Sequence, residues 1–397
     1  MILFISSHNL ATNPRLVKEI DLALSLSFKV EVICFIFRNW SYGINKEILE
    51  RLQKQGVKFH LIEAGKEDFF DWIISVAAEK INYFLSYFFR SERVLANAIS
   101  RRNYLLLKEA KEIKQADLVI GHNPGALYAT KETANRLNCK AGFDVEDYHP
   151  GEGNIRYSQK IMKSLMKKIL PLMDYVSFAS DLTKQEVFNE IHQFENDRFT
   201  ILNYFPKLEF LQPLNLNSNK LKLVWFSQNI SAGRGLEYIL PSVEKMPENI
   251  ELYLFGNISE EYRKKISGKN IFIHSPLPQK DLHTKLKDFD IGLALEEASD
   301  YNRDICLTNK IIAYYQAGLF ILASNTKAQQ KFIAEKASGK IFDLKNPQMD
   351  LVLLELFKNL HILRHQKNER FESASSNNWE SESLKLSNVW LKNTTIQ

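Results

Sequence analysis

Short apolar runs alternate with segments of helical period from the first residues of this chain onward. Ile2 to Ser6 is a run typical of a buried strand, and Lys29 to Phe37 is a second run, rich in β-branched and aromatic residues. Between them, Asn13 and Pro14 suit the cap and first turn of a helix, and apolar residues follow at helical spacing. A strand, a helix and a second strand in this order predict an α/β protein with a parallel, doubly wound sheet.

The same alternation continues through the rest of the chain and suggests two similar halves. Further strands are predicted at 117–121, 141–144, 174–180, 221–226, 250–255, 271–274, 290–295 and 320–323. A loop is expected at 227–236, after the strand at 221–226, and a helix at 235–245. The segment from Lys207 to Lys220 contains Pro213 and a polar run at 215–220, which is typical of a linker. We therefore expect a first domain at 1–206, a linker at 207–220, a second domain at 221–372 and a last segment at 373–397. The apolar helix face expected in that last segment consists of Trp379, Leu384, Leu386, Val389 and Trp390.

The composition is ordinary for a folded protein and excludes several special classes. The 397 residues are enough for two or three domains, and 45% of them are apolar. A net charge of +5 is too small to indicate nucleic acid by itself, so no nucleic-acid partner is predicted. The three cysteines, Cys34, Cys139 and Cys306, have neither disulfide nor zinc spacing. The chain start lacks the features of a signal peptide and no run is long enough to span a bilayer, so the predicted location is the cytoplasm.

The segment from Thr308 to Ser324 predicts a short helix, a stop and a buried strand. Thr308 or Asn309 can cap the helix, and Gly318 stands where a left-handed residue ends it. The free N–H groups of a helix start attract anions. Lys310 adds a full positive charge in the first turn, where the helix dipole disfavours a cation. This placement indicates either an anionic ligand or an exposed lysine.

This segment resembles the asparagine-lysine, tyrosine, alanine-glycine segment of GT-B glycosyltransferases, especially the large retaining family four (glycosyl transferases group 1). Three other stretches resemble that family: the opening loop at 7–15, the histidine loop at 121–127 and the asparagine-proline exit at 203–206. The resemblance covers nearly the whole chain. It implies a GT-B fold, in which two Rossmann-like domains face each other across a cleft and the last helix crosses back to the first domain.

The resemblance implies that a nucleotide diphosphate sugar binds mainly to the second domain. Arg234 replaces the family's lysine before a glycine and can form bidentate hydrogen bonds to a phosphate. Gln228 and Asn229 stand where the family has an earlier arginine. Ala313 and Ile305 stand where it has paired glutamates, and Glu296 and Glu297 are the nearest acidic substitutes. The implied donor-binding residues are Gly233, Arg234, Gly235, Glu296, Thr308, Asn309 and Lys310.

Catalytic and acceptor-binding residues are expected in the first domain. His122 follows an apolar strand and is predicted to face the cleft, although a hydrogen-bonded structural histidine is the alternative. Glu146 and Asp147 take the places of a histidine and a glutamate in related enzymes, and with His122 they are the predicted catalytic residues. The residues expected to bind the acceptor are Arg15, His149 and Glu152. A second interpretation of the acidic run is a metal site at Asp144, Glu146 and Asp147, as in the GT-A fold; we expect no metal and no cofactor.

The segment from Phe69 to Phe89 is strongly aromatic, and four arginines follow it by residue 102. Aromatic and basic neighbours favour an anionic membrane surface, and the alternative is a pair of helices that covers the first sheet.

The predicted function is transfer of a sugar from a nucleotide diphosphate sugar to a saccharide or lipid-linked acceptor, in the synthesis of a cell-surface polysaccharide. Retention of configuration is implied by the resemblance. Two alternatives remain open, a nucleotide-sugar 2-epimerase and a GT-B-like scaffold subunit without donor chemistry. The absent paired glutamates and the absent early arginine favour the scaffold.

Overall fold

The computed structural model of the chain describes residues 1–63, 65–153, 155–191, 196–214, 218–266, 268–345 and 348–394. It divides into two compact units, which are Met1–Leu202 with Ser383–Gln397, and Asn203–Glu382. The sequence placed the corresponding boundaries at residue 206 and residue 373. Residues 215–217 of the predicted linker lie outside the described residues.

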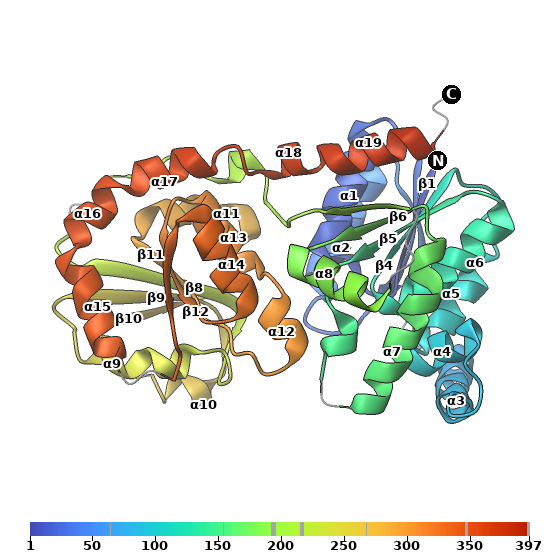
Figure 1. The fold of residues 1–397 in the computed structure, drawn as a ribbon, viewed down its shortest axis with the longest axis horizontal. Coiled ribbons are helices and arrows are strands. Elements are labelled where there is room, and N and C mark those ends of the chain that lie inside the picture. Colours follow the sequence, from blue (N-terminus) through green and yellow to red (C-terminus); the bar gives the residue numbers. More distant parts are fainter. Residues whose placement is uncertain are drawn as a thin grey trace. The chain divides into compact units, whose positions relative to one another are not determined.

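The first unit is built on a seven-stranded sheet in which all described strand pairs are parallel (Figure 1). The strand order is β3-β2-β1-β4-β5-β6-β7, so the order reverses between β1 and β4. The strands are β1 (Ile2–Ser6), β2 (Val30–Ile36), β3 (Lys58–Glu63), β4 (Leu118–His122), β5 (Lys140–Val145), β6 (Tyr175–Phe178) and β7 (Asp197–Thr200). Strand β1, in the interior of the sheet, is completely buried, as expected of a parallel strand that helices cover on both faces.

Helices connect these strands and cover the sheet. They are α1 (Pro14–Ser25), α2 (Tyr42–Lys54), α3 (Phe69–Leu85), α4 (Glu92–Ile99), α5 (Arg102–Ala110), α6 (Leu127–Leu137), α7 (Arg156–Ile169), α8 (Asp181–Glu190) and, from the chain end, α19 (Leu384–Asn393). The side chain of Asn13 caps α1 by accepting a hydrogen bond from the N–H of Leu16, as the sequence predicted. None of the described helices is both long enough and apolar enough to cross a membrane.

The second unit contains a six-stranded parallel sheet in the order β10-β9-β8-β11-β12-β13, with a reversal between β8 and β11. Its strands are β8 (Leu221–Ile230), β9 (Ile250–Ile258), β10 (Ile271–His274), β11 (Ile291–Ala294), β12 (Phe320–Ser324) and β13 (Gly339–Phe342). Its helices are α9 (Leu240–Glu244), α10 (Glu260–Arg263), α11 (Gln279–Lys285), α12 (Tyr301–Ile305), α13 (Asn309–Gln316), α14 (Lys327–Lys336), α15 (Met349–Lys358), α16 (Leu360–His365), α17 (Lys367–Ala374) and α18 (Trp379–Glu382).

The end of the chain belongs to the first unit, as the predicted crossing of the last helix implied. In α19 the side chain of Trp390 is fully buried, and its ring lies 6.1 Å from that of Phe4 on β1. Its Nε1–H donates to the hydroxyl of Tyr175 at 2.9 Å. Leu384 was expected on the same apolar face, but it is 59% exposed because it lies at the first turn of α19.

Two local predictions in the second unit need correction. The helix expected at 235–245 is a 3-10 turn followed by the short helix α9. Pro241 is the reason, because it has no N–H to continue the hydrogen bonds of the preceding turn. Strand β8 extends to Ile230, past the predicted end at residue 226, through an irregularity between Phe226 and Asn229. Gln228 and Asn229 are therefore part of a strand, not of the predicted loop.

Candidate functional site

The predicted donor residues gather at one edge of the second sheet. The loop that follows β8 carries Gly233, Arg234 and Gly235, and Glu296 is the second residue after the end of β11. These two strands are neighbours, and the strand order reverses between them. In open α/β sheets, ligands bind outside the carboxyl ends of the strands at such a reversal.

The glycine-arginine-glycine loop has a conformation that depends on its glycines. Gly233 and Gly235 have φ angles of 72° and 80°, in the left-handed region. A Cβ atom at Gly235 would lie 2.8 Å from Cβ of Leu295, so no larger residue fits there. The guanidinium of Arg234, between them, donates from Nη2 to Oγ of Ser227 at 2.9 Å. The loop therefore holds a half-buried cation at a defined place at the edge of the sheet.

Lys310 does not stand alone at the start of α13, because it forms an ion pair with Glu296. Its Nζ lies 2.6 Å from Oε1 of Glu296, and both side chains are almost buried. The same Nζ lies 5.4 Å from the centroid of the Trp225 ring. The hydroxyl of Ser324 fixes the backbone of Glu296 by accepting from its N–H and donating to its carbonyl. The cation that the sequence left unexplained is thus compensated by a carboxylate from a neighbouring strand end.

The start of α13 is as predicted in position but not in capping. Thr308 is the N-cap residue with an extended backbone, yet its side chain makes no capping hydrogen bond. Asn309 is the first helical residue and accepts at Oδ1 from Nδ2 of Asn203 at 2.7 Å. Gly318 has a φ angle of 71°, which confirms the predicted left-handed end. Ala313, at the family's glutamate position, is fully buried.

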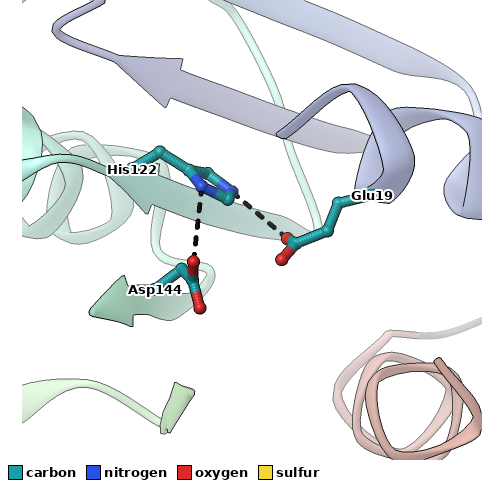
Figure 2. A group of neighbouring side chains, drawn as sticks. All are labelled: Glu19, His122 and Asp144. Atoms are coloured by element: carbon teal, nitrogen blue, oxygen red, sulfur yellow. Dashed lines mark hydrogen bonds and ion pairs between the residues drawn. The ribbon is translucent and has the colours of Figure 1, made fainter. Parts of the chain in front are cut away.

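A buried cluster of charged side chains lies near the reversal point of the first sheet (Figure 2). Arg15 and Glu19 come from α1, His122 ends β4, and Asp144 lies on β5. The guanidinium of Arg15 binds both oxygens of Asp144, at 2.7 and 2.8 Å, and donates to the carbonyl of Ile201 at 2.6 Å. These side chains are no more than 1% exposed. Arg15, predicted to bind the acceptor, is therefore part of the interior.

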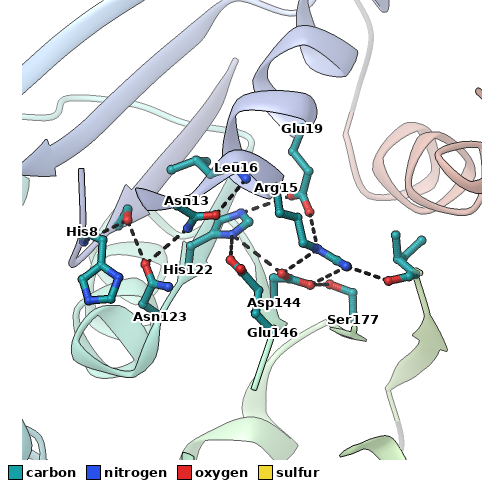
Figure 3. Close-up of polar contacts among 12 residues, drawn as sticks. His8, Asn13, Arg15, Leu16, Glu19, His122, Asn123, Asp144, Glu146 and Ser177 are labelled. Atoms are coloured by element: carbon teal, nitrogen blue, oxygen red, sulfur yellow. Dashed lines mark hydrogen bonds and ion pairs between the residues drawn. The ribbon is translucent and has the colours of Figure 1, made fainter. Parts of the chain in front are cut away.

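His122 connects this cluster to the surface of the unit (Figure 3). Its Nε2 lies 3.2 Å from Glu19 Oε2, and its Nδ1 lies 3.5 Å from Glu146 Oε1. The ring is completely buried, whereas Glu146 is 23% exposed. The expectation that His122 faces a cleft is thus not met, because the ring is enclosed and turned toward carboxylates on both sides. Glu146 therefore joins the buried cluster to the solvent-exposed surface of the unit.

The charges in the cluster depend on one another. Burial by itself would lower the pKa of His122, but Glu19 and Glu146 raise it to about 10. Burial would likewise raise the pKa of Glu19, and His122 and Arg15 lower it instead. Burial raises the pKa of Asp144 to about 7, although Arg15 acts in the opposite direction. We therefore interpret His122 as an imidazolium held between carboxylates.

Three members of the cluster have the ligand atoms of a possible metal site. Oxygens of Glu19 and Asp144 and a ring nitrogen of His122 lie within 4.8 Å of one another. Arg15, however, already occupies both oxygens of Asp144 and lies 3.5 Å from Glu19. Because a guanidinium supplies the positive charge that an ion would bring, we interpret the group as an ion-pair network.

Beside the cluster, the loop after β4 has an unusual backbone conformation and contacts residues around the loop after β1. Asn123 has a φ angle of 67° without being glycine, which is typical of functional sites. Its Oδ1 accepts hydrogen bonds from Ser6 Oγ and Asn13 Nδ2, at 3.0 and 3.3 Å (Figure 3). Burial and then Arg102 lower the pKa of the adjacent loop residue His8 to about 4, so its imidazole is neutral near pH 7.

The remaining predicted residues form a second small group. His149 Nδ1 lies 3.0 Å from Glu152 Oε1. Burial would lower the pKa of His149, and Glu152 raises it. Asp147 accepts a backbone hydrogen bond from the N–H of His149 and is half-buried. The acidic run after β5 thus divides, with Glu146 turned to His122 and the others close to His149.

Sequence reasoning missed Glu19, His8 and Asn123 as members of this region. Glu19 follows Arg15 at a spacing of four residues, so the helix places both on one face. That spacing is a signal that was available in the sequence. The contact of Glu19 with His122 joins residues 103 positions apart and carries no such signal.

The raised pKa of His122 predicts a pH dependence of stability. Because the folded state binds this proton more tightly, the stabilisation is complete below the unfolded pKa of 6.5 and is lost as the pH rises toward 10. The free energy of unfolding should therefore fall between pH 7 and 10 more steeply in the wild type than in His122→Gln, by an amount on the order of a few kcal/mol. Urea unfolding at several pH values measures this. Parallel curves for the two proteins would show that His122 is neutral in the fold.

No protein-family model and no curated protein matches the sequence. Solved structures do match over nearly the whole chain. Anabaena HepE in complex with UDP has a TM-score of 0.70 at 11% identity, covering 98% of this chain and 99% of its own. A glycosyltransferase from Rickettsia africae has a TM-score of 0.66 at 14% identity, covering 99% and 98%. An S. aureus TarM variant bound to fondaparinux, α-GlcNAc-glycerol and UDP has a TM-score of 0.64 at 13% identity, covering 99% of both chains.

These similarities extend through both units and agree with the two parallel sheets described above. At identities of 10 to 14% they establish the architecture of the chain. The protein therefore has the GT-B fold, the pair of Rossmann-like domains that these glycosyltransferases share.

Proposed function

We propose that this protein is a glycosyltransferase that moves a sugar from a nucleotide diphosphate sugar to a saccharide or lipid-linked acceptor. We place the reaction in the cytoplasm, in the synthesis of a cell-surface polysaccharide. The observation that carries the proposal is the set of Arg234, Lys310 and Glu296 at the reversal point of the second sheet. HepE has been solved with UDP-glucose and the TarM variant with UDP, so a uridine diphosphate sugar is the first candidate donor.

Each of these residues has a role that its surroundings allow. Arg234 uses one N–H for Ser227, and its other donors can meet the oxygens of a diphosphate. Lys310 lies at the N-terminal turn of α13, where free N–H groups also favour an anion. Glu296 keeps Lys310 in place before the donor binds, and a carboxylate at this position can accept hydrogen bonds from ribose hydroxyls.

In the transfer, the bond between the anomeric carbon and the diphosphate breaks, and negative charge develops on the leaving diphosphate. Arg234, Lys310 and the helix start would stabilise that charge electrostatically, so no metal ion is required. Glu146 is the carboxylate through which the first unit would position or deprotonate the acceptor hydroxyl. His122 would hold Glu146 in place, and the family resemblance supports retention of configuration at the anomeric carbon.

The test is a direct assay of donor use and product. The protein is incubated with a panel of nucleotide-sugars and oligosaccharide acceptors in excess chelator, and NMR determines the anomeric configuration of any product. We expect turnover in chelator and a product of the donor's own configuration. Activity that returns only with Mg²⁺ or Mn²⁺ would contradict the metal-free mechanism, and an inverted product would contradict retention. Binding of donors without turnover on any acceptor would favour the scaffold over the enzyme.

A further inference from the structure

Helix α3 of the first unit carries most of its large apolar side chains on its outer side, unlike an ordinary surface helix. Of its 17 residues, Ser75 is the one that is buried. The side that packs on the unit is only partly apolar: it includes the half-buried Trp72 and Tyr83, but Ser75 Oγ also accepts from Nη1 of Arg101, and Glu79 accepts from the backbone N–H of Arg101. Water-soluble proteins place apolar residues on that side. The sequence of α3 therefore contradicts its place on the surface unless something covers the outer side.

The outer side of α3 and the turn after it form a continuous apolar stripe. Residues at spacings of three and four are exposed along its length, including Phe70 at 77%, Phe84 at 64% and Phe88 at 68%. The exposed apolar residues of this region, which we call the α3 stripe, are Phe69, Phe70, Ile73, Ile74, Ile81, Phe84, Tyr87, Phe88 and Phe89. A contiguous exposed set of this size marks a surface that meets a partner.

A cationic groove lies on the helices next to the stripe. Helix α3 packs against α4 and α5, and α6 packs against both of these (Figure 1). A groove of about 360 Å³ on these helices has four cationic side chains and one acidic one in its lining, namely Arg93, Lys108, Lys111, Arg136 and Glu132. Tyr104, Tyr128 and Thr133 complete its polar lining. We call this the α5–α6 groove.

Most of the positive charge in the groove is not compensated. Lys108 pairs with Asp71 of α3, which ties the groove to the stripe, and Glu132 lies 3.5 Å from Lys131. Among the described residues, Arg93 and Lys111 form no ion pair. Arg136 donates to the carbonyls of Ala110 and Ile113, which leaves its charge in place. The groove therefore attracts an anion.

We propose that the α3 stripe and the α5–α6 groove together dock the protein on a bilayer that contains anionic phospholipid. The apolar rings would enter the boundary between headgroups and acyl chains, and the groove would take a phosphate headgroup. The occupant is a lipid surface, not a second copy of the chain, because the cations beside the stripe fit an anionic partner. A second copy would bring the same cations to the contact. This inference does not depend on glycosyl transfer and can succeed or fail without it.

The experiment is vesicle flotation of the full chain with phosphatidylcholine alone and with phosphatidylcholine that contains phosphatidylglycerol. We expect flotation with phosphatidylglycerol at low salt and its loss at high salt, where charges are screened. Arg93→Glu with Lys111→Glu should weaken binding to these vesicles by about tenfold or more, since each basic residue near the surface contributes. The matched control is Lys264→Glu with Lys269→Glu, which changes the charge equally at exposed lysines of the second unit and should bind like the wild type.

The apolar part has its own pair of variants. Phe88→Ser with Phe89→Ser should also reduce flotation, whereas Leu172→Ser with Leu208→Ser, at exposed leucines elsewhere, should not. Unchanged thermal unfolding shows that each variant is folded.

Titration with glycerol phosphate tests whether the groove binds a soluble phosphate in the absence of a bilayer. Binding of glycerol phosphate in the groove without flotation would overturn the proposal in favour of a soluble anion. A dimer that Phe88→Ser with Phe89→Ser dissociates would overturn it in favour of a second copy.

Discussion

Replacing Arg15 by methionine should lower the free energy of unfolding by about 3–5 kcal/mol, the range for removing one partner of a buried ion pair. Methionine has a similar length, so the effect is mainly that of leaving Asp144 without its guanidinium. Asp144 is 1% exposed and receives two hydrogen bonds or ion contacts from Arg15, at 2.7 and 2.8 Å. The carbonyl of Ile201 would lose its partner as well. Urea unfolding, followed by tryptophan fluorescence, measures the change.

Arg51 provides the matched control, because it also pairs with an aspartate but does so on the surface. Its guanidinium contacts Asp21 at 2.7 Å, and the two side chains are 44% and 40% exposed. Arg51→Met should therefore cost less than about 1 kcal/mol. Adding Asp144→Asn to Arg15→Met should recover part of the loss, since it removes the uncompensated carboxylate. Equal urea midpoints for Arg15→Met and Arg51→Met would refute the central role of this pair.

Arg234→Ala should weaken binding of UDP by about 1.5–3 kcal/mol, the range for a hydrogen bond to a charged group. That is a decrease in affinity of roughly tenfold to 150-fold. Arg234→Lys should retain part of the affinity, because it keeps the charge but loses the planar pair of donors. Lys310→Ala should act in the same direction, and more strongly than loss of a charge alone, since Glu296 would then face the diphosphate unpaired. Isothermal titration calorimetry measures all three.

Lys327 is the control for this site. It lies in the same unit, pairs with Asp304 at 3.0 Å and is 59% exposed, so Lys327→Ala should bind UDP like the wild type. Arg234 is half-buried, and Lys310 and Glu296 keep 12% and 13% of their side chains exposed, so neither alanine variant should unfold the protein. If UDP binds equally well to Arg234→Ala and Lys310→Ala, the donor site lies elsewhere.

The strands and the order of elements were predictable because they depend on local patterns. Runs such as Ile2–Ser6 and Phe320–Ser324 are apolar up to a final serine, and helices cover both faces of a parallel sheet. Gly318 ends α13 in the left-handed conformation that the local sequence required. The helix predicted at 235–245 is not continuous in the structure, because Pro241 lies within it and has no N–H to donate.

The site was predictable in its parts but not in its pairings. Arg234 was proposed from the family resemblance and Lys310 from its place in the first turn of a helix, and the reversal of strand order explains why they belong to one edge of the sheet. The partner of Lys310 is 14 residues away on another element, and Ser324 fixes that partner from a third. No local pattern encodes such a contact.

The sequence by itself determined the alternation of strands and helices and the glycines that shape the loop before α9. These follow from hydrophobic period and from the backbone freedom of single residues. The GT-B architecture was implied by the resemblance of several motifs to a known family. Only the tertiary structure decided which charges are paired. Arg15, predicted at the acceptor, is enclosed with Asp144, and His122 lies between Glu19 and Glu146. It also decided that the apolar side of α3 faces outward. Burial and charge pairing depend on distances between residues far apart in the chain, and those distances exist only once the sheets have formed.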